Sequence, residues 1–524
     1  MAERTIPMPE EAAKRLSAHL SAPIRWTFLA TLILGLVTHL YMLVNKLPNH
    51  DDIFYLFQCD YGTLSGRWFL PFVMQWDGAF SMPWLIGVLS LLCLAGTACL
   101  SVSLLRIRKP LACVVTAALL VAFPAVTSTF TYMFTADAYF FALFLAAFSA
   151  YAVVRFPVMG LPLGAVSLIL SMGIYQSYFP VAAVLMVGTL LFDCLEGQLS
   201  FLRIVLRGIK MVFTLGISIV VYIAAAHLTT QETGLSDYMG ISSMGSVSLE
   251  QLPMLIRQCY ETYRDYFWSN PYGWYFDFLP VLLQIAAVAA VALLLLLLIR
   301  RRVGVLRGLL AVVLAVLYPL AGNLIYIMVA GGHTHFLMIY GAVYALVLPV
   351  ALTSFAAEHV ADMGKLRCWL QALLSWLLLG TMALTAYSYM VADNKAYLKA
   401  EISLEQLSAY SNRLVAAIQS SEGYTPETPV LLIGNAVADA TLVTPEELSD
   451  VFMTGIFGAA TYRSEYSYND YLNRFLALPN TVYLDNDNQD DLNRIRVDVA
   501  TWMPTYPQAG SIQLVDGYMV VRLN

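Results

Sequence analysis

The chain contains eleven apolar segments, most of them long enough to cross a lipid bilayer. A bilayer core of about 30 Å requires about 20 residues of helix at 1.5 Å per residue. Composition agrees, since 59% of the residues are hydrophobic and only 12% are charged. We therefore expect a polytopic membrane protein with segments near residues 26–44, 83–104, 110–127, 137–154, 158–174, 180–194, 211–228, 276–299, 308–330, 336–356 and 369–391.

Basic residues predict the orientation of these segments. With the N-terminus inside, 17 of the 29 Lys and Arg residues fall in segments on the cytoplasmic side. The outer loops before the tail hold only Lys46, Arg67, Arg257 and Arg264. Cytoplasmic loops are normally the basic ones, so we expect the N-terminus inside and, after eleven crossings, the C-terminal tail outside. The net charge of −6 gives no basic surface for nucleic acid.

The tail reads as a small folded unit rather than as a further membrane segment. Residues 393–420 alternate charged and apolar groups at helical spacing, and residues 429–434 read as a buried strand. Residues 444–447 form a capping box that predicts a helix through Phe452. Asp516-Gly517 between two apolar runs predicts a β-hairpin. We therefore divide the chain into a transmembrane domain (1–391) and an extracytoplasmic α/β domain (392–524).

A second long outer loop, residues 229–275, contains an amphipathic stretch at 249–268. Its apolar groups recur at helical spacing and aromatic residues follow at its end. Either a helix lying on the membrane surface or a lid over a lipid-facing site has this pattern.

The first outer loop carries the densest group of ionisable residues at a membrane face. Asp51 and Asp52 follow the first segment, and Arg67-Trp68 and Asp77 come later in the same loop. A carboxylate at a membrane–water boundary can accept a proton from a substrate hydroxyl. A solvated acidic loop is the alternative, but the flanking aromatic residues favour a packed one.

Asp137 lies at the outer end of the fourth segment. It is either a first-turn residue of that helix or a second carboxylate that meets Asp51 or Asp52. In the second case it would orient an acceptor or join them in holding a divalent metal such as Mg²⁺ or Mn²⁺.

Two further polar clusters fall on the same side of the membrane. Tyr175, Gln176 and Tyr178 end the fifth segment, where amide and phenol groups suit sugar hydroxyls or phosphate oxygens. His333 and His335 lie between the ninth and tenth segments. These histidines could bind an anionic headgroup, chelate a metal or be ordinary loop residues.

Taken together, these motifs resemble the bacterial Gtr-type glucosyl transferases (the glucosyl transferase type II family), integral-membrane enzymes with a GT-C-like fold. The resemblance rests on Asp51-Asp52, Arg67-Trp68, Asp137 and residues 173–177, and on residues 503–507 and 517–522 of the tail.

The resemblance implies transfer of a sugar, glucose in the family, from a polyprenyl-phosphate carrier to a cell-surface glycan. The location would be the outer face of the bacterial cytoplasmic membrane. The reaction would invert the anomeric centre, with Asp51 or Asp52 as the base and Asp137 as its partner. Tyr175 and Gln176 would line the sugar or phosphate site.

Two other functions fit a membrane protein of this kind. A lipid-linked sugar flippase or transporter would carry polar residues along its helix interiors, which the sequence lacks. A GT-C transferase for another sugar or acceptor would share the layout, because donor choice depends on the shape of the site.

Overall fold

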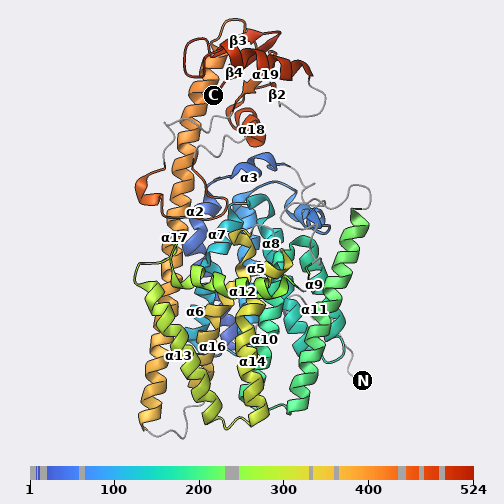
Figure 1. Ribbon diagram of the computed structural model, residues 1–524, viewed down its shortest axis with the longest axis vertical. Helices are drawn as coiled ribbons and strands as arrows, with labels where there is room; N and C mark the ends of the chain where they lie inside the picture. The colour runs from blue at the N-terminus through green and yellow to red at the C-terminus, as the bar shows by residue number, and fades with distance from the viewer. Residues whose placement is uncertain are drawn as a thin grey trace.

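The computed structural model describes residues 8, 10–11, 20–57, 65–230, 247–248, 250–329, 334–358, 365–434, 444–458, 465–482 and 490–523. It is a bundle of long helices with a small α/β domain at one end (Figure 1). We call the end beneath this domain the domain-proximal end. The opposite end, which carries the turn at Arg301 and Arg302, is the basic end. The bundle helices are α2 (Ala22–Val44), α5 (Pro83–Leu104), α6 (Pro110–Ala122), α7 (Pro124–Phe130), α8 (Met133–Arg155), α9 (Gly160–Ile174), α10 (Phe179–Glu196), α11 (Phe201–Thr229), α13 (Leu279–Arg300), α14 (Val305–Gly322), α16 (Tyr344–Ala357) and α17 (Lys365–Gln419).

The polytopic membrane architecture predicted from hydropathy is confirmed. Among the described residues, nine helices are long and apolar enough to span a bilayer, and α6 with α7 makes a tenth if the bent pair is one span. The fifth predicted segment forms α9, which has only 15 residues. All eleven predicted segments therefore contain apolar helix, but 110–127 is bent, 158–174 is short, and 308–330 is divided between α14 and the short α15.

The break between α6 and α7 follows from Pro124. Proline has no backbone N–H and its ring clashes with the preceding turn, and here the two helices are bent by 44°. The freed carbonyls find side-chain donors: Leu120 accepts a 2.8 Å hydrogen bond from the Tyr340 hydroxyl and Val121 accepts one from His39. Irregular backbone inside a bundle is stable only when its polar groups are satisfied in this way.

Short elements cover the domain-proximal end. The amphipathic stretch at 249–268 is helical as predicted, forming α12 and η5, and α12 lies across the spanning helices (Figure 1). Its Tyr263 hydroxyl donates to the Pro319 carbonyl of α14 at 2.9 Å, while Met254 stays exposed. The short elements are α3 (His50–Phe54), α4 (Leu70–Val73), η2 (Met74–Asp77), η3 (Gln176–Tyr178), α12 (Leu252–Tyr263), η5 (Arg264–Trp268), α15 (Ile325–Met328), η6 (Phe336–Met338) and η7 (Tyr340–Val343).

The C-terminal domain is built on the far end of α17, which runs unbroken from the bundle for 55 residues. The boundary drawn at residue 391 falls inside this helix and remains a prediction. The sheet has the order β2-β1-β4-β3, with β1 parallel to both neighbours and β3 antiparallel to β4. Its elements are β1 (Val430–Ile433), η9 (Glu446–Leu448), α18 (Glu465–Leu476), β2 (Thr481–Val482), α19 (Asp490–Trp502), β3 (Ile512–Val515) and β4 (Tyr518–Arg522).

The predicted strand at 429–434 and the predicted hairpin are both present. Asp516 and Gly517 have φ of 48° and 85°, as the two central residues of a type I′ turn require. The predicted helix from the capping box through Phe452 is wrong, because only the three-residue η9 forms. The backbone N–H of Phe452 bonds instead to the Tyr272 carbonyl at 3.2 Å, so the chain leaves helical geometry to reach the bundle.

Candidate active site

Asp52 anchors the first outer loop to the start of α8. Its Oδ1 accepts hydrogen bonds from the Ser81 hydroxyl and, at 3.1 Å, from the backbone N–H of Phe134 in the first turn of α8. Its Oδ2 forms a 2.7 Å ion pair with Lys46. A carboxylate at a helix N-terminus stabilises the N–H groups that have no partner within the helix. Asp52 is fully buried, so this structural role accounts for both of its oxygens.

Asp51, its neighbour, has a different environment. Its carboxylate lies 3.7 Å from the His50 imidazole, and 23% of its side chain is exposed. Burial lowers the pKa of His50, while the Asp51 charge acts in the opposite direction. Of the two adjacent carboxylates, Asp51 is therefore the one that a substrate can reach.

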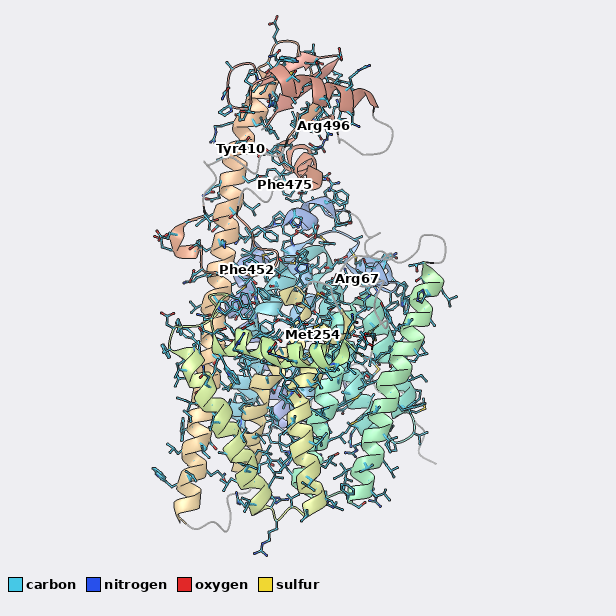
Figure 2. All side chains as sticks on the ribbon, viewed as in Figure 1. Arg67, Met254, Tyr410, Phe452, Phe475 and Arg496 are labelled. Carbon is cyan, nitrogen blue, oxygen red and sulfur yellow. The ribbon has the colours of Figure 1, made fainter. Side chains whose placement is uncertain are left out.

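A buried arginine lies at the same end of the bundle (Figure 2). The Arg67 guanidinium donates a 2.8 Å hydrogen bond to the Tyr139 hydroxyl and lies 5.1 Å from the ring centre of Tyr175. The two tyrosine rings stack with their centroids 4.2 Å apart. Tyr178 completes the group, with its ring 5.2 Å from that of Tyr175. Cation–π contacts of this kind hold a guanidinium in place without neutralising its charge.

The loop that carries Arg67 is fastened to the end of α9. The Gln176 amide donates to the Ser65 carbonyl at 2.7 Å and to the Tyr222 hydroxyl at 2.6 Å. Trp68 packs against Gly173 so closely that a Cβ there would lie 2.8 Å from the indole ring. The predicted residues Arg67, Trp68, Tyr175, Gln176 and Tyr178 are thus brought together, with Gln176 holding the loop in place.

Asp137 lies on α8, two residues before Tyr139, and is 5% exposed. Asp52 contacts α8 at the backbone N–H of Phe134, and among the described residues it forms no hydrogen bond with Asp137. The carboxylate that interacts electrostatically with Asp137 is Asp77, at the end of η2. Burial raises the pKa of Asp77, because its charged form is poorly solvated there.

A segment of the C-terminal tail enters the domain-proximal end of the bundle. We call residues 450–457 the tail insert; Figure 2 shows its Phe452 beneath the C-terminal domain. Val451, Met453 and Ile456 belong to the same buried apolar core as the membrane helices. The carbonyl of Val451 accepts a 2.8 Å hydrogen bond from Lys399 of α17.

The tail insert also contacts the loops around the predicted site. The Thr454 carbonyl accepts from the Thr131 hydroxyl at 3.2 Å, just before α8 begins. The Thr454 hydroxyl accepts from the backbone N–H of Phe336, next to His335, at 3.0 Å. The Phe457 ring lies 5.5 Å from the His50 ring. His335 is half-buried in this region, and His333 lies outside the described residues.

The conditional metal site at Asp51, Asp52 and Asp137 does not fit this geometry. Asp52 already binds an ammonium group and two hydrogen-bond donors. Within the described ranges, no group of three or more His, Cys, Asp and Glu side chains is arranged to hold an ion. The three carboxylates therefore do not form a metal site.

Comparison with known proteins identifies the family. The family model described as glucosyl transferase GtrII matches residues 40–346, more than half of the chain. The chain belongs to the GtrII glucosyl transferase family. No curated protein and no solved structure gives a significant match. The match covers Asp51, Arg67, Asp137 and Gln176, but the tail insert and the C-terminal domain lie beyond it.

Several residues of this GtrII family member were not identified from the sequence. Lys46 is the ion-pair partner of Asp52, although in the sequence it is only one of the few basic residues of the outer loops. Tyr139 belongs to the polar cluster around Asp137 in the sequence, but no local pattern marks it as the partner of Arg67. Tyr222 lies inside an apolar helix, where tyrosine is an ordinary residue, so nothing in the sequence marks it as the partner of Gln176.

Proposed function

We propose that the chain transfers a glucosyl group from a polyprenyl-phosphate donor to a glycan acceptor at the domain-proximal end. Family membership supports the transfer of a sugar. The carrying observation is the buried Arg67 guanidinium, which is oriented by Tyr139 and Tyr175 at the end of an apolar bundle. A lipid-linked sugar keeps its prenyl chain in the bilayer and its reactive carbon near the membrane face, and Arg67 is buried at one end of the bundle, close to such a face.

The positive-inside pattern supports an orientation in which this end faces outward. The basic end would then face the cytoplasm, and the C-terminal domain would lie outside a bacterial cytoplasmic membrane. Glycan acceptors at the cell surface would reach the site from that side.

In the proposed mechanism the acceptor hydroxyl attacks C1 of the sugar while the C1–O bond to the phosphate breaks. Asp51 accepts the hydroxyl proton, and polyprenyl phosphate leaves with the electrons of the broken bond. Arg67 stabilises the charge on that phosphate, for which its planar fork of donors is suited. Attack opposite the leaving group inverts the anomeric centre. Asp52 positions α8, on which Asp137 and Tyr139 lie, and does not itself accept the proton.

The experiment is a turnover assay with purified protein and a panel of polyprenyl-phosphate sugars, with and without acceptor glycan. Release of polyprenyl phosphate is measured for wild type, Asp51→Asn, Asp137→Asn and Arg67→Gln. Asp265→Asn is the matched control, because Asp265 is an exposed carboxylate on η5 at the same end. We expect glucose to be the preferred sugar and Asp51→Asn to lose turnover by at least about 100-fold, the scale of general-base catalysis.

Full turnover in Asp51→Asn would contradict the assignment of the base. Full turnover in both Asp51→Asn and Arg67→Gln would contradict the location of the site. Transport of the lipid-linked sugar across the membrane without release of polyprenyl phosphate would favour the flippase alternative.

A further inference from the structure

A cavity lies at the basic end of the bundle, away from the proposed active site. Its volume is about 640 Å³, and its walls are the start of α2, the ends of α5 and α8 and part of α10. Arg155 of α8 lines it, 18 residues along the same helix from Asp137. At 1.5 Å per residue this separates the two sites by about 27 Å.

The cavity carries a positive charge that the protein does not neutralise. Arg106 also lines the cavity, but its charge is neutralised by Asp193 and by Glu196 at 2.8 Å, and Asp193 binds Arg207 as well. Arg155 is exposed, and across the described part of the chain no acidic residue forms an ion pair with it. An anion entering the cavity would therefore meet an available guanidinium.

The other cavity walls combine hydroxyl groups with apolar side chains. Ser21, Ser103 and Tyr151 line it, and none of their hydroxyls bonds to another described residue. Ile24, Leu100 and Val154 supply apolar surface beside them. A ligand that satisfies both kinds of wall has an anionic, hydrogen-bonding head and a hydrocarbon body.

We propose that this cavity binds the headgroup of an anionic phospholipid, with its phosphate on Arg155. Arginine is well suited to phosphate oxygens because several of its donors can bind at once. Free hydroxyls at the mouth suit the phosphate and glycerol oxygens, and the apolar wall accommodates the upper acyl chain. The cavity opens among the ends of spanning helices, where phospholipid headgroups are concentrated.

The test is native mass spectrometry of the purified full-length protein with phosphatidylglycerol, and with phosphatidylcholine as the zwitterionic comparison. We expect one tightly bound phosphatidylglycerol in wild type and an affinity about tenfold lower in Arg155→Gln. Arg203→Gln is the matched control, since Arg203 is an exposed arginine at the same end that does not line the cavity. Ser103→Phe keeps the charge but fills the cavity, so it should lower the affinity as well.

Equal phosphatidylglycerol binding by wild type, Arg155→Gln and Arg203→Gln would overturn the proposal. Equal binding of the two lipids would also overturn it, because the cavity would then not distinguish an anionic headgroup from a zwitterionic one. In a further arm, millimolar inorganic phosphate is added: displacement of the lipid would identify a soluble-anion site, whereas no displacement supports a lipid site. These outcomes are measured without sugar transfer, so they do not depend on the proposed function.

Discussion

The packing of the tail insert against the bundle can be tested at Gly455. This glycine has φ of 87°, and a Cβ there would overlap the Thr131 hydroxyl and lie 2.7 Å from the Thr131 Cβ. Thr131 has little freedom to move, because its hydroxyl bonds to the carbonyls of Ser128 at 2.8 Å and Thr454 at 3.2 Å. Gly455→Ala therefore adds a steric clash to the cost of a left-handed backbone.

The magnitude follows from these two terms. A left-handed conformation costs an alanine about 1–2 kcal/mol. Displacing Thr131 would add roughly 1–3 kcal/mol, the usual range for overpacking a filled core. We thus expect the folded state to be destabilised by about 2–5 kcal/mol, enough to release the tail insert from the bundle.

Gly517→Ala is the matched control, because Gly517 has φ of 85° but no neighbouring atom within 4 Å of a built Cβ. It should show only the backbone cost. The assay is the apparent thermal midpoint in detergent, with limited proteolysis to detect new cleavage within residues 450–458. If the two variants lowered the midpoint equally and neither exposed new sites, the tail insert would not be packed as described.

Three further predictions concern the site. Arg67→Lys should raise the KM for the lipid-linked donor by about tenfold, because lysine reproduces neither the paired donors nor the tyrosine stacking; an unchanged KM in initial-rate measurements would argue against donor-phosphate binding. Asp52→Asn should lower the free energy of unfolding by roughly 2–3 kcal/mol, because the new amide places an NH₂ group against Lys46 in a buried pair. Asp51→Asn should stay near wild type in the same thermal denaturation experiment. Burial raises the pKa of Asp77 in the folded state. Ionisation of Asp77 therefore lowers the free energy of unfolding of the protein as pH rises from about 4 through that pKa. Asp77→Asn should therefore gain thermal stability relative to wild type more at pH 7 than at pH 4, and a difference independent of pH would refute this reasoning.

Hydropathy predicted the bundle well because the bilayer imposes one constraint on every spanning segment. The hairpin was also predictable, since Asp516-Gly517 has a local conformational preference that needs no distant partner. The helix expected through Phe452 failed for the opposite reason. A capping box favours helix locally, but Trp274, Tyr272 and Thr131 offer hydrogen bonds that only the folded bundle can supply.

The candidate site was predictable in its residues more than in their roles. Arg67, Trp68, Tyr175 and Gln176 were expected at one membrane face, and the structure brings them into contact. Sequence could not distinguish Asp51 from Asp52, because the difference depends on Lys46, Ser81 and the start of α8. Partners that meet only after folding leave no local pattern.

The unbroken α17 fixes the distance between the C-terminal domain and the membrane-spanning bundle. Its 55 residues give a rod of about 80 Å, far longer than the roughly 30 Å hydrocarbon core. Two sets of hydrogen bonds restrain the tilt of α17. Lys399 of α17 donates to the tail insert, and Arg474 of α18 donates to the carbonyls of Ile53 and Phe54 in α3 at 2.8 and 2.9 Å. A tilt of α17 would therefore strain the Arg474 hydrogen bonds to α3, the element that bears Asp51, so the position of the domain and the position of this loop are coupled.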